Sequence, residues 1–98
     1  MRIWTKKLPM KNDPRIEFTP RFTTRRKAAP VAIKEAFRET LELFLEDFNH
    51  PSLRNHPLTG IYHGFRSIDV TPDWRALYRE EPERIIFVDL GTHEQLYG

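Results

Sequence analysis

Side chains suited to acid–base and phosphate chemistry are concentrated in residues 56–98. They are histidines, carboxylates, arginines and a tyrosine: His56, His63, Arg66, Asp69, Asp73, Arg75, Arg79, His93 and Tyr97. RNA can be cleaved without a metal ion when a base removes the 2′-OH proton, an acid protonates the leaving 5′-oxygen, and fixed positive charge meets the phosphorane. Histidine suits the first two roles because its pKa lies near neutral pH, and arginine suits the third because its planar fork matches phosphate oxygens. These residue types permit metal-free RNA cleavage, although many small domains contain the same set.

The same region shows the two-residue periodicity of β-strands, interrupted by turn-forming residues. Alternation over 64–70 places Ser67 and Asp69 on one side and Ile68 and Val70 on the other. Further strands are expected over 74–79 and 84–90, with turns at 71–73 and 80–83 and a break at 91–92. Tight turns between the strands predict an antiparallel meander, and its most apolar strand, 84–90, should lie inside the sheet.

A helix over 31–48 is expected to cover this sheet. Its apolar residues recur at intervals of four, four, three and four: Ile33, Phe37, Leu41, Phe44 and Phe48. Upstream, residues 15–19 alternate as a short strand with Ile16 and Phe18 inward, and Pro20 can open a short basic helix. The expected fold class is therefore α+β, with an N-terminal strand and one or two helices packed on a small antiparallel β-sheet.

Size and composition restrict the class of protein further. Ninety-eight residues without cysteine predict a single domain over 1–98 with neither disulfides nor a thiolate metal site. The lack of a long apolar stretch predicts a soluble cytoplasmic protein with no membrane contact. Residues 1–30 hold nine Lys or Arg against two acids, and 1–14 are expected to form an extended or flexible basic arm. Such charge favours a polyanionic or acidic partner, although small soluble proteins often carry this asymmetry.

Three sequence blocks resemble the RelE/ParE superfamily of bacterial toxins, and within it the YafQ-like branch of mRNA interferases. The blocks are HPLTG at 56–60, GFRSIDVTPDWRALY at 64–78 and LGTHEQLYG at 90–98. Members of the branch read H-x-L-x-G, then G-x-R-x-x-H-x-x-P-D-W-x-L-x-Y, then G-T-H-x-x-L followed by Phe or Tyr. One block alone is weak, but all three in this order, spacing and C-terminal position are specific for the superfamily.

By position, the resemblance implies a ribonuclease site that contains His56, Asp73 and His93. It also implies that Trp74 supports Asp73 and contacts substrate, that Tyr97 contacts a nucleotide, and that Arg75 stabilises phosphate. Other cations are expected to contact the RNA: Arg66, Arg79, Lys6, Lys7, Lys11, Arg21, Arg25, Arg26 and Lys27. No metal or other cofactor is expected.

Two positions depart from the branch. Asp69 stands where the branch has a histidine between G-x-R and P-D-W, and Asp89 falls where an arginine is usual on the third strand. A carboxylate can accept a proton, so Asp69 remains a candidate catalytic residue, but it is a poor acid at neutral pH and repels phosphate. We therefore expect Asp69→His to maintain or raise cleavage.

The resemblance implies the toxin of a type II toxin–antitoxin system, an endoribonuclease that cuts mRNA in the ribosomal A site and is bound by a cognate antitoxin. Two alternatives stay open, namely a ParE-type toxin that binds DNA gyrase without cutting RNA, and a catalytically impaired homologue that acts as an antitoxin-binding partner. On the residues alone, His56 and Asp73 could be turn residues and Trp74 a core residue. A metal site built from His56, His63, Asp69 and His93 would match no compact metal motif.

Overall fold

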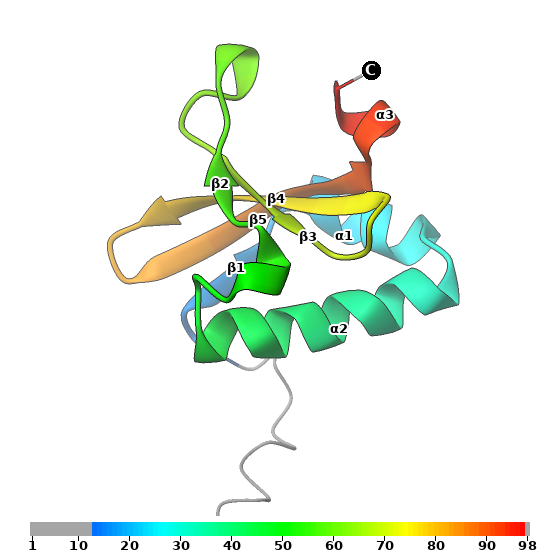
Figure 1. Cartoon of the computed structure of the whole chain (residues 1–98), viewed down its shortest axis with the longest axis horizontal. Coiled ribbons are helices and arrows are strands. Elements are labelled where there is room, and N and C mark those ends of the chain that lie inside the picture. The colour runs from blue at the N-terminus through cyan, green and yellow to red at the C-terminus, as the bar shows by residue number, and fades with distance from the viewer. Residues whose placement is uncertain (1–12, 98) are drawn as a thin grey trace, which may run out of the picture.

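The computed structural model describes residues 13–97, so most of the basic arm expected over 1–14 lies outside the described residues. Ten elements follow one another: β1 (Ile16–Phe18), α1 (Pro20–Ala28), α2 (Val31–Glu46), the 3-10 helix η3 (Pro51–Leu53), β2 (His56–Pro57), the 3-10 helix η4 (Gly60–Tyr62), β3 (Arg66–Asp69), β4 (Trp74–Glu81), β5 (Arg84–Thr92) and α3 (His93–Tyr97). One sheet forms the middle layer, with α2 beneath it (Figure 1). The α+β class is confirmed.

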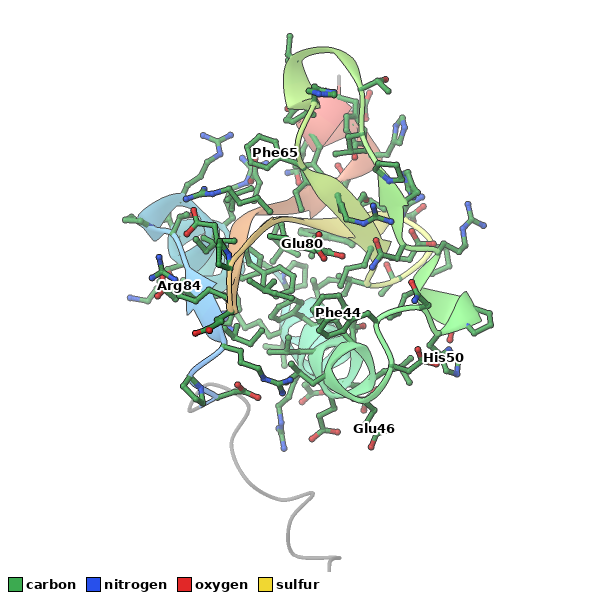
Figure 2. The ribbon with its side chains drawn as sticks, turned by 90° about the vertical axis from the view of Figure 1, so that its left-hand side faces the viewer. Phe44, Glu46, His50, Phe65, Glu80 and Arg84 are labelled. Atoms are coloured by element: carbon green, nitrogen blue, oxygen red, sulfur yellow. The ribbon has the colours of Figure 1, made fainter. Side chains whose placement is uncertain are left out.

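Helix α2 covers one face of the sheet through the predicted apolar stripe. Ile33, Phe37, Leu41 and Phe44 are at most 8% exposed, and Phe48 packs against the same core from beyond the helix end. Figure 2 looks along this helix: Phe44 points to the sheet and Glu46 points away from it. The helix ends at Glu46, two residues before the predicted end, because Asp47 adopts an extended conformation.

The sheet has five strands in the order β1-β5-β4-β3-β2. The predicted meander of β3, β4 and β5 is confirmed, and β5 lies inside the sheet as expected. The sheet as a whole is mixed, because the N-terminal strand β1, whose pairing the sequence left open, pairs parallel with β5, with Ile16 opposite Ile85. A further difference is β2, whose His56 pairs with Ser67 of β3. Two residues are too few to show an alternating pattern, so periodicity could not reveal this strand.

Strand β5 continues through Gly91 and Thr92, so the predicted break at these residues is wrong. Gly91 pairs with Arg75 and Thr92 with Trp74, which means that the ladder with β4 outweighs the low strand propensity of glycine. The register shifts at Leu77 and Tyr78, where the pairing passes over Val88. A shift of this kind bends the strand and changes which side chains face each side of the sheet.

Helix α1 covers the part of β5 that extends beyond β1. The backbone N–H of Thr19 donates to Phe87 O at 3.0 Å, Thr19 Oγ1 donates to Val88 O at 3.2 Å, and Arg25 Nε donates to Leu90 O at 3.0 Å. Thr19 also caps α1 by accepting from the N–H of Phe22. The predicted helix after Pro20 is therefore confirmed, and it protects an exposed sheet edge. Within residues 13–97, no helix has the length and apolar character needed to cross a bilayer.

Candidate functional site

The face of the sheet opposite α2, called the open face below, carries the residues that could do chemistry. Ile68, Ala76 and Leu90 belong to the core on the α2 side. Alternation along the strands therefore places the residues between them on the open face. These residues are Ser67, Asp69, Arg75, Leu77, Asp89 and Gly91. Both η4 and α3 project from the sheet on this side (Figure 1).

Strand register brings several predicted site residues into neighbouring rows of the open face. Asp69 lies opposite Arg75, and Arg75 lies opposite Gly91. One step further along, the backbone N–H of His93 donates to Asp73 O at 3.2 Å, which ties the start of α3 to the β3–β4 turn. Asp73 and His93, which are 20 positions apart in the chain, are thereby neighbours at one end of the sheet.

His56 is exposed on the edge strand β2, and its ring has a defined orientation. Its Nδ1 lies 2.7 Å from Arg54 O. Because a carbonyl oxygen can only accept, Nδ1 must carry the proton, and the neutral ring then presents Nε2 as a free acceptor. Arg54 holds this carbonyl in place through a left-handed backbone conformation, with φ 48° and ψ 43°. The arrangement is suited to a general base.

A hydrogen-bond network behind His56 supports this edge. Arg66 Nε donates to Asn55 Oδ1 at 2.8 Å, and Asn55 Nδ2 donates to the hydroxyl of Tyr78 at 2.7 Å and to Phe48 O at 3.1 Å. Burial raises the pKa of Tyr78, so its hydroxyl stays protonated at neutral pH. Arg66 was predicted to contact RNA, but in the structure it anchors the residue that precedes His56.

His93, Tyr97 and Tyr62 form an aromatic row between α3 and η4. The ring centroids of His93 and Tyr97 are 4.8 Å apart, and those of Tyr97 and Tyr62 are 5.6 Å apart. The Tyr62 hydroxyl donates to Leu96 O at 2.6 Å, so η4 is joined to α3. His93 and Tyr97 are exposed, and such rings offer stacking surfaces for nucleobases. Trp74, by contrast, packs against the hydrophobic core.

Asp69 is held between two arginines. Its Oδ1 lies 3.1 Å from Arg75 Nε and its Oδ2 lies 3.3 Å from Arg54 Nε. The carboxylate is only 14% exposed and Arg75 is 15% exposed, whereas Arg54 is 72% exposed. Arg75 also donates to Pro72 O at 2.8 Å. These contacts make Asp69 a partner of cations rather than a free carboxylate.

A second carboxylate on the same face is bound in the same way. Asp89 lies 3.0 Å from Arg21 Nε and 3.4 Å from Arg25 Nε, and it is 10% exposed. Gly91 leaves room for Arg25, because a Cβ at this position would lie 2.9 Å from Arg25 Nη2. The guanidinium of Arg25 thus lies against Gly91, whose partner on β4 is Arg75.

Other predicted cations lie elsewhere. Arg79 pairs with Glu81 near the β4–β5 turn. Arg26 lies 4.6 Å above the ring of Phe18, and burial lowers the pKa of its guanidinium. Lys27 is exposed at the end of α1. Within residues 13–97, no three His, Asp or Glu side chains gather as a potential metal site.

Two residues at the site were not singled out from the sequence, namely Arg54 and Tyr62. Each contacts a residue far away in the chain, since Arg54 pairs with Asp69 and Tyr62 donates to Leu96 O. No local pattern could have found them. A hollow of about 960 Å³ beside Ile16, Phe48 and the β4–β5 turn contains none of the predicted catalytic residues.

Several solved structures that share this fold are toxins of toxin–antitoxin systems. E. coli YafQ from strain BL21(DE3) aligns with a TM-score of 0.74 and 24% identity, covering 85% of this chain and 97% of that one. YafQ in the E. coli DinJ–YafQ toxin–antitoxin complex aligns at 0.61 with 25% identity, covering 85% and 96%. A YoeB/ParE toxin from Agrobacterium tumefaciens aligns at 0.66 with 15% identity, covering 81% and 98%. The fold is thus that of the RelE/ParE-type toxins.

The sequence comparison narrows this class. Residues 14–98 match the family described as "Bacterial toxin of type II toxin-antitoxin system, YafQ", and the chain therefore belongs to the YafQ toxin family. The curated mRNA interferase toxin YafQ of E. coli K12 is 38% identical over 45 residues, which are 46% of this chain and 49% of that protein. The match thus spans about half the length of the relative.

Proposed function

We propose that the chain is the toxin of a type II toxin–antitoxin pair and cleaves mRNA by metal-independent general acid–base catalysis. The observation that carries this proposal is the contact between His56 Nδ1 and Arg54 O, 2.7 Å apart, because it leaves Nε2 of an exposed histidine free to accept a proton. The activity named for the E. coli relative supports the same conclusion.

In the proposed reaction, His56 takes the proton from a ribose 2′-OH, and the 2′-oxygen attacks the adjacent phosphorus. The bond from phosphorus to the 5′-oxygen breaks, and His93 supplies a proton to that leaving oxygen. The products are a 2′,3′-cyclic phosphate and a 5′-hydroxyl. Asp73 positions His93 through the backbone hydrogen bond at 3.2 Å, and the rings of Tyr97 and Tyr62 are available for stacking on a base. Positive charge for the phosphorane comes from arginines of the open face.

We further propose that the substrate is mRNA in the ribosomal A site and that a cognate antitoxin controls the toxin. The complex of E. coli YafQ with DinJ supports an antitoxin partner. An acidic antitoxin segment would complement the exposed cations Arg21, Arg54 and Lys27. Placement in the cytoplasm follows from this substrate.

Expression under tight control, with mapping of mRNA 5′ ends and of plasmid supercoiling, tests the proposal. We expect in-frame mRNA cleavage that falls by about 100-fold or more in His56→Ala and in His93→Ala. His50→Ala is the matched control, since His50 only caps η3 by accepting from the N–H of Ser52. Intact mRNA with gyrase-dependent DNA damage would instead identify a gyrase-binding toxin. Cleavage by purified protein with and without ribosomes tests the A-site substrate.

A further inference from the structure

A row of six charged side chains, in two ion-paired clusters, crosses the open face from the segment before β2 to α1. It consists of four arginines and two aspartates, in the order Arg54, Asp69 and Arg75, then Arg25, Asp89 and Arg21. Arg75 pairs with Gly91 in the ladder and Arg25 lies against Gly91 from α1, so these two are the inner members, while Arg54 and Arg21 are the two ends. The row carries a formal charge of +2, four cations against two anions.

Each aspartate binds one inner and one outer arginine. Asp69 binds Arg75, which is 15% exposed, and Arg54, which is 72% exposed. The second aspartate repeats this arrangement, with Arg25 at 30% and Arg21 at 64% exposure. The inner arginines, Arg75 and Arg25, are largely buried against the sheet, while the outer arginines are mostly exposed to solvent. The ion pairs restrict the conformations of the outer arginines, Arg54 and Arg21. These long side chains would otherwise lose much rotamer entropy when they bind a ligand.

The outer arginines keep donors available for an anion. Arg54 and Arg21 contact their aspartates through Nε. Within residues 13–97, neither has a hydrogen bond or ion pair assigned to its terminal Nη groups. A guanidinium carries five N–H donors in a planar fork, so four remain on each outer arginine to bind phosphate oxygens in a bidentate manner.

We propose that Arg54 and Arg21 bind two separate backbone phosphates of a single-stranded RNA that crosses the open face, and that Asp69 and Asp89 are positioning residues for these arginines. The inference rests on the proposed function for the identity of the polyanion. It reassigns both acidic departures from the YafQ-like pattern, because each carboxylate recruits cations to the face instead of repelling the substrate. The positive charge at the site then comes from four arginines on three segments of the chain, namely α1, the residue after η3, and β4.

Binding of a non-cleavable 2′-O-methyl oligoribonucleotide over a range of salt concentrations tests the proposal. We expect Arg54→Ala and Arg21→Ala each to weaken binding by roughly tenfold and to reduce the slope of log K against log salt by about 0.7, the value for one phosphate contact on a single strand. Arg38→Ala, an exposed arginine on α2, is the matched control and should change neither. Arg54→Lys should restore part of the affinity.

The aspartates provide the sharper test, because net charge alone and arginine positioning predict changes of opposite sign in RNA affinity when an aspartate is neutralised. Asp69→Asn and Asp89→Asn each remove one negative charge, which would tighten RNA binding if only net charge mattered. We expect weaker binding instead, with a higher KM for cleavage, because the arginines lose their fixed orientation. Tighter binding in both variants, or Arg54→Ala and Arg21→Ala behaving like Arg38→Ala, would overturn the proposal.

Cleavage of an ordinary RNA, measured in parallel with and without ribosomes, separates this proposal from the proposed function. If the wild-type protein cleaves but the arginine variants bind normally, the phosphate-binding row is wrong and the nuclease stands. If the wild-type protein cleaves in neither condition but binding depends on Arg54 and Arg21, the row stands and the nuclease is wrong. Thermal unfolding of each variant checks that the comparison is between folded proteins.

Discussion

Asp69 and Arg75 face each other across β3 and β4, and Oδ1 of the aspartate lies 3.1 Å from Nε of the arginine. The second oxygen of Asp69 lies 3.3 Å from Arg54 Nε. Both oxygens thus contact cations, and we therefore expect Asp69 to position arginines instead of accepting a proton. This role leads to the predictions below.

Asp69→His should lower RNA cleavage, by roughly tenfold if one charge-assisted contact is lost. The sequence alone favoured unchanged or higher cleavage, because histidine is the branch's residue at this position. In the structure, a histidine would leave Arg75 and Arg54 without their shared carboxylate. The rate of RNA cleavage measures the effect, with Asp69→Glu as a control that keeps the charge. A cleavage rate equal to or above that of the wild-type protein would show that position 69 acts directly in proton transfer.

Asp69→Ala should lower the free energy of unfolding by about 2 to 3 kcal/mol, because it leaves the largely buried Arg75 without its charge partner. Glu81→Ala is a matched control, since Glu81 also contacts two arginines, Arg79 and Arg84, but at a more exposed position. Its cost should stay below about 1 kcal/mol. Urea denaturation of both variants provides the comparison. Equal losses of unfolding free energy would show that the Asp69 ion pairs stabilise the fold no more than the more exposed Glu81 ion pairs do.

Gly91→Ala should displace Arg25 and weaken RNA binding severalfold. The added Cβ would lie 2.9 Å from Arg25 Nη2 and 3.0 Å from Gln95 Oε1, and both are ends of flexible side chains. Stability should therefore fall only modestly, by about 1 kcal/mol. A double-mutant cycle with Arg25→Ala measures the coupling. If Gly91→Ala weakens binding as much in the Arg25→Ala background, its effect does not pass through Arg25.

Stability should fall at alkaline pH through ionisation of Tyr78. Burial raises the pKa of Tyr78 above its ordinary value of 10.0, so the folded state holds the phenol proton more tightly than the unfolded state. The resulting stability is fully present below about pH 10 and is lost as pH rises through the folded pKa. Urea denaturation between pH 8 and about 11 should show this loss in the wild-type protein and a smaller one in Tyr78→Phe.

The neutral-pH comparison provides the control for that experiment. Tyr78→Phe removes one acceptor from Asn55, which still donates to Phe48 O, so the variant should lose about 1 kcal/mol at pH 7. A decline above pH 10 that is as steep in Tyr78→Phe as in the wild-type protein would assign the alkaline transition to other groups.

Local patterns in the sequence were enough to predict most elements of the fold. The spacing of Ile33, Phe37, Leu41 and Phe44 predicted the helix that covers the sheet, and alternation predicted β3, β4 and β5. The three motif blocks predicted the toxin family. These features could be read because periodicity, turn residues and motif spacing are properties of consecutive residues. The parallel pairing of β1 and the two-residue strand β2 could not be predicted in this way, because pairing partners are set by contacts across the fold.

The same distinction applies to the site. The residue types at His56, Asp73 and His93, and the two acidic departures at Asp69 and Asp89, are determined by the sequence itself. What the carboxylates do was decided by the tertiary structure, which brings Arg54 and Arg75 to Asp69, and Arg21 and Arg25 to Asp89. A charge is repulsive or attractive toward a phosphate only in combination with its neighbours. Those neighbours come from the residue after η3, from β4 and from α1, so only the folded chain defines the electrostatics of this surface.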